Sequence, residues 1–93
     1  MAKSTKFAGA VRSQLAEENP EAFLFADFDD ALVGIARGFA LSAVAVYDQD
    51  KCLRILMKRG LKRDEAEEYF DFNVIGTWAG EHMPIFLDKN IAV

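Results

Sequence analysis

Residues 48–76 have the sequence DQDKCLRILMKRGLKRDEAEEYFDFNVIG, which predicts two helices joined by a very short turn. The first helix is expected to be capped by Asp48 or Asp50, because a short acidic side chain accepts a hydrogen bond from a free backbone N–H of the first turn. Its apolar face contains Cys52, Leu53, Leu56 and Met57. Gly60 is expected to adopt the left-handed conformation that ends this helix, and Leu61 to contact its last turn. The stretch therefore predicts a helical hairpin.

The second helix of this hairpin is expected to have Lys62 as its N-cap and to end at Gly76. Its inner face contains Ala66, Tyr69, Phe70, Asn73 and Val74. Asn73 brings a polar amide to this apolar face, and a buried amide without a partner costs roughly 1–3 kcal/mol. We therefore expect Asn73 to be a structural polar residue, hydrogen-bonded to the backbone of a neighbouring strand or of residues 78–80.

Four further elements are expected before the hairpin. Apolar residues at every fourth position predict a helix over residues 5–18, which Asn19-Pro20 ends. The apolar run 22–26 favours a buried strand over the first turn of another helix. The next segment has apolar residues at the spacing of one helix face, namely Phe28, Leu32, Ile35, Ala36 and Phe39. Residues 43–47 are partly β-branched and predict a strand at the centre of a sheet.

The C-terminal segment, residues 77–87, favours two short strands around a turn, and Pro84 restricts the second to a sheet edge or a strand start. Residues 1–4 and 88–93 are expected to be loose tails. Together these elements predict one α+β domain over residues 1–93, in which three or four short strands pack against about four helices.

Composition excludes several classes of protein. The chain has 93 residues, and 52% of them are hydrophobic, which is enough for a core without disulfides or a structural metal. Cys52 is the only cysteine, so we expect no internal disulfide and a reducing cytoplasm. No apolar region follows the N-terminal lysines, and no stretch approaches the ~18 unbroken apolar residues of a membrane helix. The net charge of −4 argues against unspecific binding to nucleic acid.

Residues 46–87 contain a series of short motifs: Val46-Tyr47-Asp48, Asp50-Lys51, residues 65–70 (EAEEYF), residues 72–76 (FNVIG), residues 78–81 (WAGE) and residues 84–86 (PIF). In these motifs the segment, somewhat less than half of the chain, resembles small uncharacterised proteins encoded by bacteriophages and prophages. The resemblance implies a small accessory gene product and no chemistry. Phage proteins of this size often bind and redirect a host or anti-phage defence protein, which is an analogy of setting. Such proteins tend to have Ser or Thr at the position of Lys62.

Two charged surfaces are expected on the helical hairpin. Acidic residues spaced for one outward face of the second helix are Asp64, Glu67, Glu68 and Asp71. Basic residues around the turn are Arg54, Lys58, Arg59, Lys62 and Arg63. The acidic face favours docking onto a basic host partner or another copy of the chain, although a plain solubilising surface explains it as well. The basic residues could contact nucleic-acid phosphates, but they also suit a solvated helix junction.

Two groups of aspartates follow predicted strands, Asp27 with Asp29 and Asp30, and Asp48 with Asp50. If the groups meet at one end of a sheet, Asp27, Asp29 and Asp48 could hold Mg²⁺ for phosphoryl transfer. Helix capping explains the same residues without a metal, so we expect none.

Trp78 follows the end of the second helix, and we expect it to anchor an interface. It is expected to form an apolar patch with Met83, Ile85 and Phe86. His82 and Glu81 could do acid or base chemistry, but no nucleophile stands in a recognisable motif. We therefore expect His82 to be an exposed turn residue.

The sequence thus predicts a cytoplasmic, phage-type accessory protein that acts by protein–protein binding. Its expected partner is a host protein or another copy of the chain in a homo-oligomer, and we expect no cofactor, metal or membrane contact. Two alternatives stay open. One is a Mg²⁺-dependent phosphoryl-transfer or nucleotide-handling enzyme, and the other is a nucleic-acid-binding protein.

Overall fold

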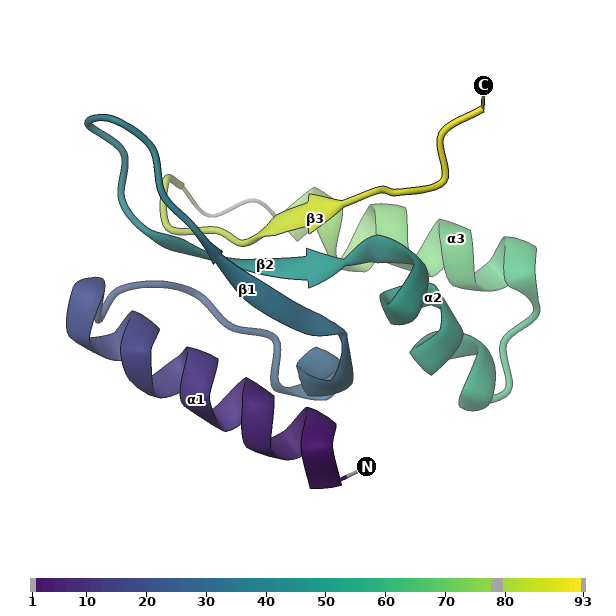
Figure 1. The fold of residues 1–93 in the computed structure, drawn as a ribbon. Coiled ribbons are helices and arrows are strands. Elements are labelled where there is room, and N and C mark those ends of the chain that lie inside the picture. The colour runs from purple at the N-terminus through teal and green to yellow at the C-terminus, as the bar shows by residue number, and fades with distance from the viewer. Residues whose placement is uncertain (1, 78–79, 93) are drawn as a thin grey trace.

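The computed structural model describes residues 2–77 and 80–92, with side chains from Lys6 onward. Within them, the helices and strands are α1 (Ala2–Glu18), the 3-10 helix η1 (Ala26–Ala31), β1 (Leu32–Ala36), β2 (Val44–Asp48), α2 (Gln49–Lys58), α3 (Arg63–Asn73), the 3-10 helix η2 (Ile75–Thr77) and β3 (Ile85–Leu87). The strands form one sheet in the order β1-β2-β3, in which β2 is antiparallel to β1 and parallel to β3 (Figure 1). The α+β class and the central place of β2 are confirmed.

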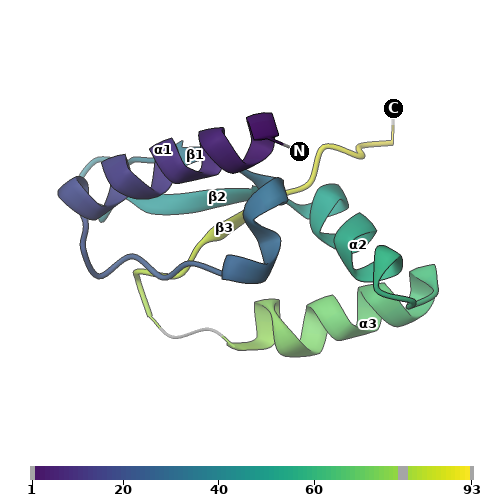
Figure 2. The same cartoon turned by 90° about the horizontal axis from the view of Figure 1, so that it is seen from below.

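The helices leave one face of the sheet uncovered. Figures 1 and 2 show α1 and η1 below β1 and β2, while α2 and α3 continue from the end of β2 and lie on the β3 side. No helix of the described residues crosses the upper face in Figure 1. None of these helices has the length and apolar character that crossing a bilayer requires.

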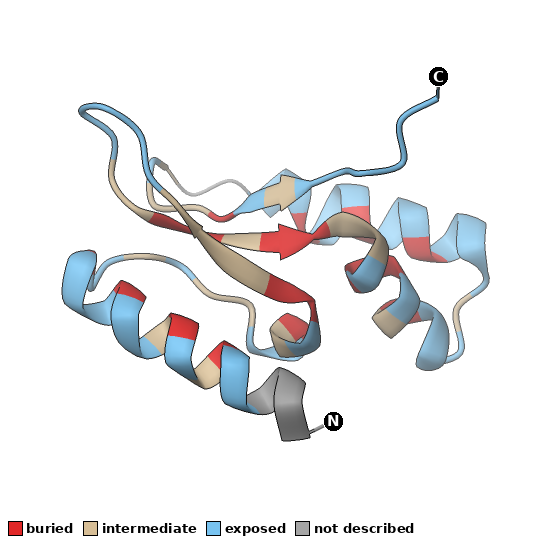
Figure 3. Ribbon diagram, viewed as in Figure 1, coloured by how far each residue is buried: buried red, intermediate tan, exposed pale blue. Residues whose placement is uncertain are grey.

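The core lies between the sheet and the helices, where buried residues face inward (Figure 3). The rings of Tyr47 and Phe86 stack with centroids 5.7 Å apart, and Phe86 meets Phe70 of α3 edge to face at 5.1 Å. Phe86 therefore links the sheet to α3. The Tyr47 hydroxyl accepts a hydrogen bond from the Phe25 backbone N–H at 2.9 Å, and burial raises the pKa of Tyr47 to about 12.

The predicted helical hairpin is confirmed, and three of its four helix ends lie where the sequence predicted, whereas α3 ends at Asn73 and not at Gly76. Asp48 Oδ1 accepts a hydrogen bond from the backbone N–H of Lys51 at 3.1 Å, which caps α2. Gly60 has a φ of 107°, and the backbone N–H of Leu61 donates to Leu56 at 3.5 Å, which is the long hydrogen bond of a Schellman motif. Glu65 accepts from the backbone N–H of Lys62 at 2.8 Å, so α3 begins where the sequence predicted.

The helix expected over residues 28–39 is wrong. This segment forms η1 and then β1, and β1 has a β-bulge between Leu32 and Gly34. In a regular strand Leu32 and Ile35 would point to opposite faces, but the extra residue at the bulge turns both toward the core. The bulge thus produces the three-residue spacing of a helix face. Phe39, expected on that face, lies in the β1–β2 loop and is fully exposed.

Three other expectations require correction. Residues 22–25 have no regular secondary structure and Ala26 already belongs to η1, so the run 22–26 is not a strand. Asn73 is exposed, because the row of buried residues runs from Ala66 through Phe70 to Val74 and is narrower than the predicted face. Its predicted hydrogen bond to the backbone of residues 78 and 79 lies outside the described residues. Among residues 77 and 80–87 of the C-terminal segment only β3 is a strand, directly after Pro84, whereas residues 75–77 form η2.

Candidate interaction surfaces

The outward face of α3 is acidic and has an aromatic residue within it. Its predicted carboxylates are all exposed, namely those of Asp64, Glu67, Glu68 and Asp71. Glu67 accepts a hydrogen bond from Arg63 Nε at 3.1 Å. Phe72, exposed to 74%, was not predicted as part of this face. Helix periodicity could have predicted its exposure, because Phe72 lies two residues after the buried Phe70 and therefore roughly 200° around the helix from it.

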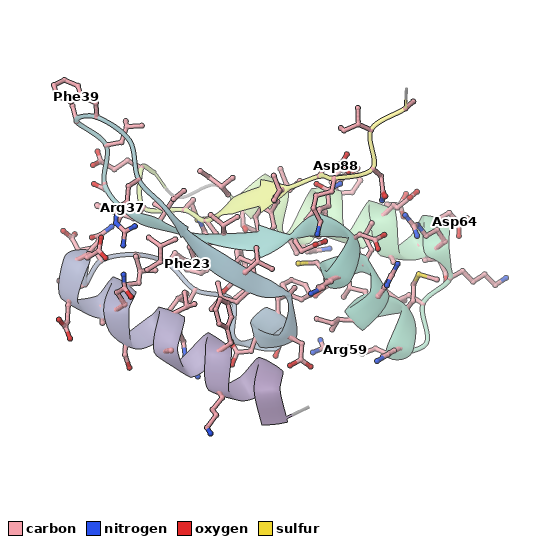
Figure 4. The ribbon with its side chains drawn as sticks, viewed as in Figure 1. Phe23, Arg37, Phe39, Arg59, Asp64 and Asp88 are labelled. Atoms are coloured by element: carbon pink, nitrogen blue, oxygen red, sulfur yellow. The ribbon has the colours of Figure 1, made fainter. Side chains whose placement is uncertain are left out.

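Beside this face lies a groove of about 280 Å³ between α2, α3 and the segment after β3. Four carboxylates line it, those of Asp50, Glu67, Asp71 and Asp88. The one basic residue among the described residues of its lining is Arg63, whose guanidinium lies 3.6 Å from Asp50 and 3.1 Å from Glu67. Asp71 and Asp88 have no ion pair within the described part of the chain. We call this the acid-lined groove, and Figure 4 shows Asp88 and Asp64 toward the same end of the molecule.

The basic residues around the α2–α3 turn are largely neutralised by acids. Arg54 pairs with Asp50 at 2.8 Å, Arg59 lies 3.6 Å from Asp27, and Arg63 lies between Asp50 and Glu67. Lys58 and Lys62 are exposed. Because the guanidinium groups already face carboxylates, the cluster offers less positive potential to a phosphate backbone than the sequence suggested.

The two groups of aspartates lie at the same end of the sheet, since Leu32 pairs with Tyr47. The three carboxylates considered for a metal, however, each face a basic group. Asp29 pairs with Arg12 of α1, Asp27 with Arg59, and Asp48 with Lys89 Nζ at 2.9 Å. Within residues 2–77 and 80–92, no three metal-ligating side chains come together.

Asp48 is a buried N-cap with a charged partner. Burial raises the pKa of its carboxyl, but hydrogen bonds from Lys89 and from the backbone of Lys51 outweigh burial, so the pKa lies below its ordinary value. Asp48 is therefore ionised and occupied in capping α2 at neutral pH.

His82 lies at a junction of three segments. It is half-buried, not exposed as predicted, and its Nδ1 lies 3.1 Å from Asn19 Nδ2. Asn19 also donates to the backbone oxygen of Ala43 at 2.8 Å, and Glu81 accepts from Ser42 Oγ at 3.0 Å. These contacts hold loops together. Cys52 is fully buried, and burial raises the pKa of its thiol to about 12, so it is not a nucleophile for His82.

The sheet face turned away from the helices is apolar. Ala45 and Tyr47 of β2 point into the core, so alternate residues point to the opposite face. The apolar residues on that side of the three strands are Gly34, Ala36, Val44, Val46, Ile85 and Leu87, and the face ends at the buried Asp48, the last residue of β2. We call them the open sheet face, because a Cβ built on Gly34 would meet no atom within 4 Å.

Trp78, the predicted interface anchor, lies outside the described residues. Of the apolar patch predicted with it, Phe86 packs into the core, Met83 is half-buried and Ile85 is exposed on the open sheet face. The patch is therefore divided between the core and the surface.

Comparison of the chain with models of protein families, with curated proteins and with solved structures gives no match in any of the three.

Proposed function

We propose that this protein acts by binding another protein, and that a basic segment of the partner occupies the acid-lined groove. The observation that supports this most is the charge of the groove, where Arg54 and Arg63 pair with Asp50 and Glu67 but Asp71 and Asp88 have no ion pair among the described residues. A Lys or Arg side chain of the partner would pair with Asp71 and Asp88. Leu53 and Phe70 at the base of the groove offer an apolar surface to the aliphatic part of that side chain.

The acidic face of α3 would extend this contact beyond the groove. Phe72 supplies an exposed aromatic group among the carboxylates, which is the kind of residue that anchors interfaces. The resemblance to phage and prophage proteins suggests a host or defence protein in the bacterial cytoplasm as the partner. Nucleic acid is disfavoured because the acid-lined groove and the outward face of α3 are negative.

A lysine-rich peptide with a fluorescent label provides a defined probe. We expect fluorescence anisotropy to show binding to the wild type, and the double variant Asp71→Asn and Asp88→Asn to weaken it about tenfold or more, since each lost charge pair in a groove is worth on the order of 1 kcal/mol. The control is Glu17→Gln with Glu21→Gln, which removes two exposed charges elsewhere. If both double variants weaken binding equally, only net charge matters and the groove is not the site.

A second experiment uses the natural partner. Proteins captured from bacterial lysate on the immobilised wild-type chain should be lost with Asp71→Asn and Asp88→Asn, and with Phe72→Ala, and should be retained with the control. A captured protein that binds all variants equally would contradict the proposed surface.

A further inference from the structure

The loop between β1 and β2 projects from the body and ends in an apolar tip. Phe39 at its end is 101% exposed and Leu41 is 73% exposed, and Figure 4 shows Phe39 at the far end of the loop. The backbone N–H of Leu41 donates to Gly38 at 3.1 Å, so residues 38–41 form a turn. A Cβ on Gly38 would lie 2.7 Å from Leu41 Cδ1, which shows that Leu41 packs against the glycine. The turn therefore presents Phe39 in one defined position.

The base of the loop is fixed to the rest of the molecule. Arg37 Nε donates to Glu18 at the end of α1 at 2.5 Å, and Asn19 Nδ2 donates to the backbone oxygen of Ala43 at 2.8 Å. Both strands that lead into the loop are thus tied to the α1 end. Because hydrogen bonds fix the base of the loop, an exposed phenylalanine at its tip is suited to entering a pocket of another molecule.

An apolar groove of about 410 Å³ lies at the base of the same loop. Its apolar walls come from Ala36, Leu41, Val44, Met83, Pro84 and Ile85. Of the described residues that line it only Glu81 is charged, and Glu81 accepts a hydrogen bond from Ser42. The groove continues onto the open sheet face through Ile85, and its volume is sufficient for a phenylalanine side chain.

We propose that a second copy of this chain occupies this groove, with Phe39 of each copy in the groove of the other. Tip and groove belong to the same loop, so a two-fold axis beside the loop brings both tips to both grooves at once. This interface is separate from the acid-lined groove, because Figure 4 shows Phe39 and Asp64 at opposite ends of the molecule.

The exposed apolar area supplies a large part of what a two-fold interface requires. Phe39, Leu41, Ile85 and Leu87 are 101%, 73%, 49% and 44% exposed, which amounts to about 500 Å² if a fully exposed large side chain has about 200 Å². A standard interface buries about 800 Å² on each partner, so these four side chains supply more than half of one share.

Charge also favours a second copy at this surface. Two copies with a net charge of −4 repel each other wherever their acidic faces approach. Among the described residues of the loop and its groove, Glu81 supplies the one carboxylate, so two identical chains can meet there with little electrostatic repulsion.

Sedimentation velocity over a range of protein concentrations tests the proposal. We expect a reversible dimer in the wild type. Phe39→Asp should raise the dissociation constant of this dimer about a hundredfold or more, because a central aromatic side chain is changed in both copies. The control, Phe7→Asp, changes an exposed phenylalanine of α1 and should leave the dimer intact. If the wild type were monomeric up to about 1 mM, its self-association would be weaker than a specific interface gives, and the proposal would be overturned. An intact dimer in Phe39→Asp would also overturn it.

Cross-linking identifies the occupant of the groove. When Phe39→Cys and Met83→Cys chains are mixed, a disulfide should join the two kinds of chain, whereas Phe7→Cys with Met83→Cys should give none. Failure of the cross-link in a sample that is dimeric would place the interface elsewhere and overturn the proposal. Sedimentation of the wild-type monomer with phosphatidylcholine vesicles would assign the tip to a membrane and would also overturn it. Loss of the dimer in Phe39→Asp with normal peptide binding at the acid-lined groove would show that the two surfaces are independent.

Discussion

The Asp48→Ala substitution removes two contacts of one buried carboxylate. Loss of the N-cap hydrogen bond to Lys51 should cost about 1 kcal/mol. The ion pair with the mostly exposed Lys89 should add at most about 1 kcal/mol, since solvent screens it. We therefore expect the free energy of unfolding to fall by about 2 kcal/mol, and the melting temperature by about 10 °C for a domain of this size.

Asp48→Asn is the matched comparison, because an amide oxygen caps a helix about as well as a carboxylate. It should lose only the attraction of Lys89, about 0.5–1 kcal/mol. The folded pKa of Asp48 lies below the unfolded value of 3.8, so the difference between wild type and Asp48→Asn is present above that value and disappears as the pH falls through the folded pKa.

Urea unfolding followed by circular dichroism measures all three proteins at several pH values. Equal losses in Asp48→Ala and Asp48→Asn would show that the charge, and not the cap, stabilises α2. The same samples test the metal alternative. If Mg²⁺ raised the melting temperature of the wild type but not of Asp48→Asn, Asp48 would be a metal ligand and the capping explanation would be incomplete.

Two further substitutions test the backbone and the pH dependence. Gly60→Ala should lower the free energy of unfolding by about 1–2 kcal/mol, because φ is 107° and the strain is in the backbone, since no atom lies within 4 Å of the added Cβ. The control is Gly9→Ala within α1, which also has open space and should raise the free energy of unfolding by about 0.5–1 kcal/mol. Equal changes in the two variants, measured by urea unfolding, would contradict this explanation. Hydrogen bonds from Arg37, and then from Gln14, lower the pKa of Glu18 from 4.5 to about 2. The stability from the Arg37–Glu18 pair is therefore present above pH 4.5 and is lost as the pH falls toward 2. Glu18→Gln should flatten the dependence of the melting temperature on pH between these values, and an unchanged dependence would show that the pair contributes nothing.

The helical hairpin could be predicted because its signals are local. The Asp48 cap, the left-handed Gly60 and the Glu65 hydrogen bond each involve residues within a few positions along the chain. The acidic face of α3 follows from helix periodicity in the same way. No distant part of the chain is required for these features, so sequence alone specifies them.

The segment from η1 to β1 could not be predicted because a distant strand determines it. Leu32 and Ile35 have the spacing of a helix face, and only pairing with β2 across the bulge reveals a strand. The acid-lined groove has the same origin, since Asp88 follows β3 while Asp50 belongs to α2. Both features arise from contacts between segments far apart in the sequence, which composition and periodicity do not encode.

The parallel pairing of β2 with β3 has a consequence for the order of folding. β2 ends at Asp48 and β3 begins at Ile85, so the sheet cannot gain its third strand until the chain between them has turned back on itself. Until then Tyr47 lacks the ring of Phe86 above it. An early folding intermediate would therefore consist of the antiparallel strands β1 and β2 and the helical hairpin. The edge of β2 that later pairs with β3 would then have unpaired backbone N–H and C=O groups.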